Sequence, residues 1–131
     1  RLHQAAAQSE NPQLRFIVGL LLLTGARKME LLKARWSDVN LERRSWHIPD
    51  TKTGKPRHVP LSQQAVELIE QLPRWQGCDW LIPNPETLRP YNTIKRAWDT
   101  ARKAAGLPGL RIHDLRHSAA SAMINGGTDL Y

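Results

Sequence analysis

The chain has 131 residues, a length typical of one domain or of part of a larger one. Apolar residues make up 40% of it and charged residues 24%, which is a globular composition, and its single cysteine excludes a disulfide framework and a multi-cysteine zinc site. Nineteen lysines and arginines against twelve acidic residues give a net charge of +7, and residues 1–65 carry eleven of the basic but only five of the acidic side chains. This imbalance favours a polyanionic partner such as nucleic acid.

The longest apolar run covers residues 16–23, far short of the roughly 20 residues needed to cross a bilayer, so we expect no contact with a membrane. The chain begins with Arg1 rather than methionine. We therefore expect it to be a piece of a longer protein.

The first predicted element is a core helix that begins near Pro12 and carries a wide apolar face through residues 14–23. Gly25 interrupts this helix, and a short helix is expected over residues 27–33, with Met29 on its buried side.

A small β-hairpin is predicted next, after turn residues at 36–40. Ser45–Ile48 has the pattern of a short strand, residues 57–61 form the returning strand, and Pro49 suggests a sheet edge. Ser62 is then a plausible N-cap for a helix over residues 63–72.

The remainder is expected to be helical. Residues 73–90 hold four prolines and two tryptophans and predict a structured connection, in which Cys78 has no special role. Helices are expected over residues 92–105 and from His113 or Asp114 to Asn125. The five tryptophans are expected in core and corner positions rather than on a base-stacking surface. The predicted fold is therefore mainly α with a small antiparallel β-sheet, an α+β class.

Three segments concentrate polar side chains. In the first, Arg27 stands where a tight turn opens a helix, so its guanidinium could face an anion. The alternative is an ordinary surface ion pair with Glu30, three residues on, worth under about 0.5 kcal/mol.

The second segment is the basic hairpin tip. Lys52 could reach a DNA groove or backbone, or donate a proton if a neighbouring cation lowers its pKa. Lys55, Arg57 and His58 follow it. The alternative is a hairpin whose charges only keep the sheet edge soluble.

The third segment enters a helix with His113, Arg116 and His117, whose spacing lets all three share one helix face. An imidazole and a guanidinium at a helix start suit a phosphate that needs both charge stabilisation and proton transfer. Two histidines four apart could also bind zinc, as in a metal-dependent hydrolase, but no third ligand is obvious, so we expect neither a metal nor a cofactor. Histidines satisfied by the local backbone are the remaining alternative.

Taken in order, three motifs resemble the catalytic domain of the tyrosine recombinases, the phage integrase family. They are Thr24-Gly25-Ala26-Arg27-Lys28-Met29-Glu30-Leu31, Thr51-Lys52-Thr53-Gly54-Lys55-Pro56-Arg57 and His113-Asp114-Leu115-Arg116-His117. The resemblance covers nearly the whole chain and is nearest in character to bacterial prophage and genomic-island integrases.

This resemblance implies a set of roles in DNA strand cleavage and rejoining. Arg27 and Arg116 would clamp the scissile phosphate, Lys52 would protonate the leaving 5′ oxygen, and His113 would assist proton transfer at the nucleophile. Glu30 would support the pocket. Two guanidiniums and a lysine would then provide the charge stabilisation that metal ions provide in other phosphoryl-transfer enzymes.

His117 is expected to support the same pocket, and Lys28, Lys55 and Arg57 to contact DNA. The resemblance places the nucleophilic tyrosine further along than this chain extends, so Tyr131 is not expected to be the nucleophile.

The resemblance thus implies a partial catalytic domain over residues 1–131, without the family's N-terminal core-binding domain or its nucleophile segment. The longer protein would join DNA through a 3′-phosphotyrosyl bond, act on double-stranded DNA as a homotetramer, and lie in the bacterial cytoplasm with the nucleoid. Residues 1–131 alone are expected to bind the DNA phosphate without cleaving. The alternative is a non-catalytic DNA-binding remnant of an integrase.

Overall fold

A computed structural model of the chain describes residues 2–9, 11–49, 54–112 and 114–115. Its elements, in chain order, are α1 (Leu2–Ala7), α2 (Leu14–Thr24), α3 (Lys28–Leu32), the 3₁₀ helix η1 (Trp36–Asp38), β1 (Val39–Asn40), β2 (Ser45–Ile48), β3 (Arg57–Pro60), α4 (Gln63–Glu70) and α5 (Lys95–Ala104). This is the predicted α+β class.

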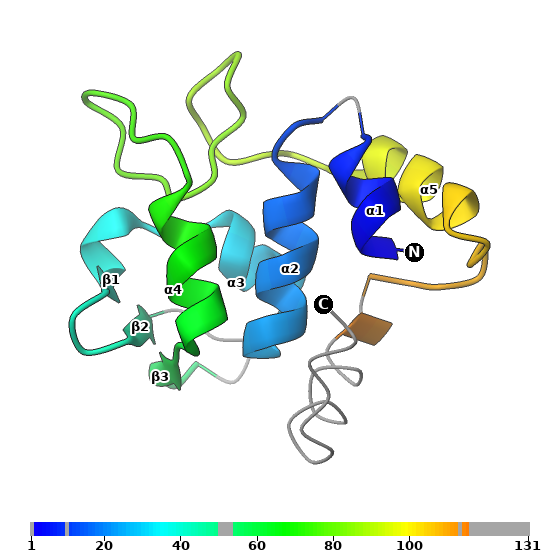
Figure 1. The fold of residues 1–131 in the computed structure, drawn as a ribbon. Coiled ribbons are helices and arrows are strands. Elements are labelled where there is room, and N and C mark those ends of the chain that lie inside the picture. Colours follow the sequence, from blue (N-terminus) through cyan, green and yellow to red (C-terminus); the bar gives the residue numbers. More distant parts are fainter. Residues whose placement is uncertain (1, 10, 50–53, 113, 116–131) are drawn as a thin grey trace.

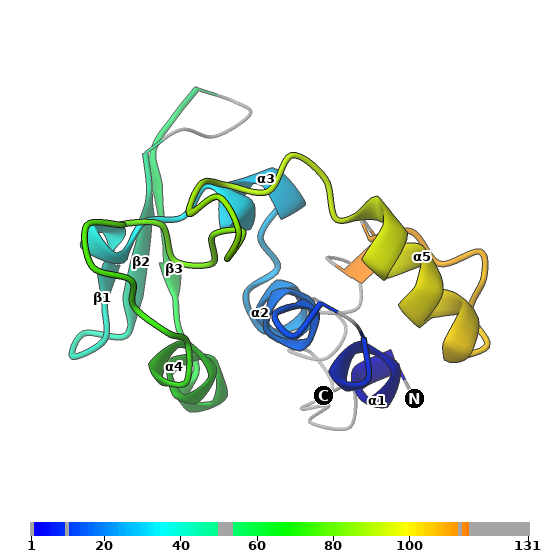
Figure 2. The same cartoon turned by 90° about the horizontal axis from the view of Figure 1, so that it is seen from above.

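Helix α2 lies at the centre of the molecule (Figure 1). Leu14, Ile17, Leu20 and Leu21 are each at most 2% exposed, as expected for a helix that is apolar nearly all round. Helices α4 and α1 pack against α2, and α5 packs against α1. Figure 2 shows the sheet beyond α4 at one end of the molecule and α5 at the other end.

The sheet is antiparallel with the order β1-β2-β3. Trp46 and Ile48 of β2 and Val59 of β3 are buried, so one face of the hairpin covers the core. The hairpin was predicted, but β1 was not, because two residues carry too little alternation to be recognised as a strand. β1 makes β2 the central strand at Ser45 and Trp46 only, and Pro49 follows the end of β2, where β2 pairs with β3 alone. Pro60, in the edge strand β3, also fits the rule that proline stands at sheet edges.

The helices predicted over residues 14–23, 27–33, 63–72 and 92–105 are confirmed, with bounds shifted by a few residues. The helix expected from His113 or Asp114 to Asn125 lies almost wholly outside the described residues. Ser62 caps α4 as predicted, its Oγ accepting a hydrogen bond from the N–H of Ala65 at 3.2 Å. Met29 is wrong as a buried residue, because 42% of it is exposed. Helix α1 was not predicted; its Ala5 and Ala6 are buried and belong to the common core, so tertiary packing rather than local pattern stabilises it.

The connection over residues 73–90 is structured, as predicted. It returns to the core beside α3, where the N–H of Leu81 donates to the carbonyl of Ala34 at 2.8 Å and Asp79 accepts from the Ser37 hydroxyl at 2.6 Å. The Cys78 thiol donates to the carbonyl of Leu88 at 3.4 Å and so has a local structural role. The predicted placement of the tryptophans is also confirmed. Trp36, Trp46 and Trp98 are buried, and Trp75 and Trp80 are half-buried.

Candidate functional site

The turn between α2 and α3 fixes the position of Arg27. The Thr24 hydroxyl donates to the carbonyl of Leu20 at 2.6 Å and accepts from the N–H of Ala26 at 3.2 Å. Gly25 ends α2 in the left-handed region with φ of 70°, a conformation that glycine adopts without steric cost. The chain therefore turns sharply and places Arg27 at the N-cap of α3.

The carboxylate of Glu30 is the centre of a polar cluster. Its Oε1 accepts hydrogen bonds from the backbone N–H of Arg27 at 2.9 Å and from Nη2 of Arg57 at 2.8 Å. Its Oε2 lies 3.8 Å from Nη1 of Arg27, a long ion pair, and the Glu30 side chain is only 5% exposed. Both interpretations of Arg27 are therefore compatible with this geometry: its backbone is bound to Glu30, while its guanidinium is only loosely paired.

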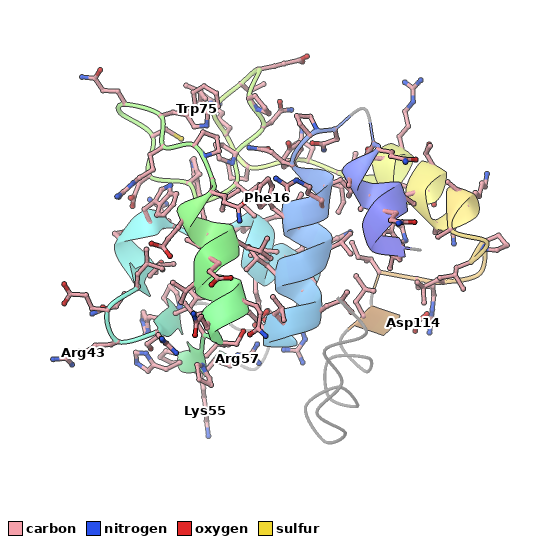
Figure 3. The ribbon with its side chains drawn as sticks, viewed as in Figure 1. Phe16, Arg43, Lys55, Arg57, Trp75 and Asp114 are labelled. Atoms are coloured by element: carbon pink, nitrogen blue, oxygen red, sulfur yellow. The ribbon has the colours of Figure 1, made fainter. Side chains whose placement is uncertain are left out.

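Strand alternation explains why Arg57 reaches Glu30. Arg57 and Val59 stand two residues apart on β3 and so point to the same, core-covering face, whereas His58 points to the other face. Figure 3 shows Arg57 near the lower end of α4 and Lys55 extending away from the molecule. The predicted contact of Arg57 with DNA stays a prediction, and the structure engages one of its nitrogens with Glu30.

An open cavity of about 640 Å³ lies in front of Arg27. The basic side chains that line it are those of Arg27, Lys28, Lys33 and Arg35, against the acidic Glu30 and Asp38. The positive charges outnumber the negative ones, so the cavity suits an anion.

The aromatic wall of this cavity was missed by sequence reasoning. Trp80 and Trp46 line it, and the guanidinium of Arg35 stacks over the Trp80 ring at 4.2 Å from its centroid. His47 lines it too, and its ring lies 4.7 Å from that of His58 on the paired strand. These side chains come together because β2 pairs with β3 and because residue 80 pairs with residue 35.

Two residues that lie just before the other predicted catalytic segments also line the cavity. Pro49, which precedes the hairpin loop, and Ile112, which precedes the third motif, both line it. Four predicted pocket residues, Lys52, His113, Arg116 and His117, lie outside the described residues.

The third motif begins with a helical turn in the described part of the chain. The N–H of Arg111 donates to the Asp114 carboxylate at 2.9 Å, and Leu115, 2% exposed, belongs to the core. The same arrangement joins Arg27 to Glu30, since in both places a carboxylate three residues on accepts the first N–H of a helical turn.

Tyr91 lies away from this cavity. It is 8% exposed, and its hydroxyl donates to the side-chain oxygen of Gln13 at 2.5 Å. Burial raises the pKa of Tyr91, while the hydrogen bond with Asn11 acts in the opposite direction. A raised pKa disfavours the phenolate form of this side chain.

Two classes of feature are absent from the described residues. They contain no group of three or more histidine, cysteine or acidic side chains that could hold a metal ion. Within the same part of the chain, no helix has the length and apolar character needed to span a membrane.

Together, these features define a helical domain with a small sheet, in which the guanidiniums of Arg27 and Arg35 lie at an open cavity. Solved structures with the same fold support this assignment. The catalytic domain of bacteriophage HP1 integrase is 34% identical, with a TM-score of 0.69 over 99% of this chain and 70% of its own. A lambda integrase dimer bound to a core site is 26% identical, with a TM-score of 0.72 over 92% of this chain and 47% of its own. Lambda integrase is also similar in a tetramer bound to a Holliday junction.

Sequence comparison gives the family directly. The model of the phage integrase family matches residues 1–131. A shufflon-specific DNA recombinase of Escherichia coli is 31% identical over 123 residues, which cover 92% of this chain and 30% of that relative. The chain therefore belongs to the phage integrase family, and the predicted resemblance is confirmed. It spans less than half the length of the curated relatives that it matches.

Proposed function

We propose that this chain supplies most of the catalytic domain of a site-specific recombinase that cleaves and rejoins double-stranded DNA. The observation that carries the proposal is the basic cavity at Arg27, which Pro49 and Ile112 also line. Those two residues closely precede Lys52 and His113 in the chain. One phosphate in this cavity would thus be within reach of three segments that are far apart in the sequence.

The proposed reaction transfers a phosphoryl group, so that one phosphoester bond forms as another breaks. A tyrosine hydroxyl, supplied from outside residues 1–131, attacks the phosphorus and gives its proton toward His113. The bond from phosphorus to the 5′ oxygen breaks, and Lys52 protonates that leaving oxygen. Arg27 and Arg116 stabilise the charge that develops on the non-bridging oxygens. Rejoining is the reverse of these steps.

The surroundings of the cavity support DNA as the partner. Lys28 lines the cavity and Lys55 is exposed at the hairpin, where each could neutralise a backbone phosphate, while His117 would support the pocket. The relatives bound to a core site and to a Holliday junction favour the same partner, and the latter favours a tetramer. The proposal places the protein in the bacterial cytoplasm with the nucleoid.

A covalent-capture experiment tests this proposal. The full-length protein that contains this chain is incubated with a library of nicked duplexes of random sequence, and adducts that survive denaturation are isolated. We expect a 3′-phosphotyrosyl adduct with the full-length protein and none with residues 1–131 alone. DNA binding by the full-length protein without any adduct would instead identify a DNA-binding remnant, and an adduct on residues 1–131 would contradict the expected place of the nucleophile.

A further inference from the structure

The described cluster at Glu30 joins two parts of the site that are 27 residues apart. Its Oε1 binds the backbone N–H of Arg27 on one side and Nη2 of Arg57 on the other, at 2.9 and 2.8 Å. The first contact belongs to the start of α3, and the second belongs to the first residue of β3. One carboxylate oxygen therefore ties the turn that presents Arg27 to the base of the hairpin.

The hydrogen-bonded ion pair between Glu30 and Arg57 is a strong interaction. The Glu30 side chain is 5% exposed, so its charge is held away from water, and Arg57 supplies the shorter of its two ion pairs. Hydrogen bonds between charged partners in such surroundings are short and directional, and they hold both side chains in place. Arg57 is itself half-buried at 32% exposure, and its Nε is buried without a partner in the described part of the chain. Its guanidinium is therefore oriented inward as well as bound.

The contact between Arg57 and Glu30 lies at the base of the hairpin loop. Arg57 pairs with Ile48 across the sheet, and these two residues are the last pair before the connection over residues 49–56. That connection includes Lys52, so the Arg57–Glu30 contact holds the point from which it departs.

We propose that Arg57 is a positioning residue, which acts through Glu30 to set the hairpin lysine, Lys52, relative to Arg27. The inference rests on the proposed function, because it assigns Lys52 as the proton donor to the leaving 5′ oxygen. It differs from the expectation that Arg57 contacts DNA: a DNA contact would change affinity, whereas a positioning role changes the proton-transfer step. A displacement of about 1 Å at a reacting group is enough to cost roughly a hundredfold in rate.

The test compares two nicked substrates in the full-length recombinase. One carries the natural 5′ oxygen at the scissile bond and the other carries a bridging 5′ sulfur, which leaves as a thiolate and needs no proton. The measured quantity is the ratio of the cleavage rate of the sulfur substrate to that of the oxygen substrate. Because both rates scale with the amount of folded enzyme, partial unfolding of a variant leaves this ratio unchanged.

We expect Arg57→Ala to raise the ratio at least about tenfold over the unsubstituted protein, since a misplaced lysine impairs only the oxygen substrate. Arg57→Gln keeps an N–H donor for Glu30 and is expected to raise the ratio less; it decides the question if Arg57→Ala yields no folded protein. Arg43→Ala is the matched control, because it removes one exposed arginine from the turn between β1 and β2 (Figure 3) and is expected to leave the ratio unchanged.

An unchanged ratio in the folded Arg57 variants would overturn the inference. A weaker affinity and a shallower salt dependence with an unchanged ratio would identify Arg57 as a DNA contact instead. Failure of the proposed function looks different, because the unsubstituted protein would then form no adduct with either substrate.

Discussion

Replacement of Glu30 by alanine should destabilise the chain more than any ordinary surface substitution. The change removes the acceptor for the N–H of Arg27, a helix-capping bond worth about 1 kcal/mol, and the bond from Arg57, worth about 1.5–3 kcal/mol for a charged pair. The long ion pair to the Arg27 guanidinium adds little, because 31% of the Arg27 side chain is exposed. With a discount for the partial exposure of Arg57, we expect a loss of about 2–4 kcal/mol in the free energy of unfolding.

Urea denaturation of residues 1–131, followed by tryptophan fluorescence, measures this loss, and thermal unfolding should show a Tm lower by roughly 10 °C. Glu42→Ala is the matched control, since Glu42 is exposed and should change the stability by less than about 0.5 kcal/mol. Glu30→Gln should fall between the two, because an amide oxygen still accepts the N–H of Arg27. If Glu30→Ala unfolds within about 0.5 kcal/mol of the unsubstituted chain, the carboxylate does not hold α3 and β3 together.

Three further outcomes follow from the described contacts. Tyr91→Phe should cost about 1–3 kcal/mol in urea denaturation, because it leaves the buried side-chain oxygen of Gln13 without its donor; a neutral effect would contradict the observed bond. Burial raises the pKa of Tyr91 in the folded state, so the contribution of Tyr91 to the free energy of unfolding is fully present below pH 10 and is lost as the pH rises through the folded pKa. Urea denaturation at a series of pH values should therefore show stability falling above pH 10, and falling less steeply in Tyr91→Phe. Gly25→Ala should cost about 1–2 kcal/mol, because an alanine is strained at a φ of 70°, and a more stable Gly25→Ala chain would show that the turn relaxes.

Much of the fold follows from short-range pattern. The apolar run of α2, the Ser62 cap and the alternation of β2 are local signals that the tertiary structure reinforces. Where an element is very short, the signal fails: β1 has two residues and α3 has five, so periodicity determines neither the existence of β1 nor the buried face of α3. Met29 shows this, because five residues of helix leave open which side meets the core.

The site residues themselves stay predictions from the order of the motifs, and only part of the geometry around them follows from the sequence. The motifs place Arg27 and Glu30 three residues apart, yet they cannot show that Glu30 binds Arg57 more closely than it binds the Arg27 guanidinium. A signal for this was present: Arg57 stands two residues before the buried Val59 and so shares its face of β3, which predicts an inward side chain. No pattern in the sequence predicts the wall formed by Trp80 and Arg35, because the two residues are far apart in the chain and meet only where residue 80 pairs with residue 35.

The most direct measurement of the central claim is a crystal structure of the full-length protein bound to nicked DNA. The proposed site requires one phosphate in the cavity, within hydrogen-bond distance of the guanidiniums of both Arg27 and Arg116, with Arg57 still on Glu30. A DNA backbone that passes elsewhere on the protein, with no phosphate at Arg27, would contradict it.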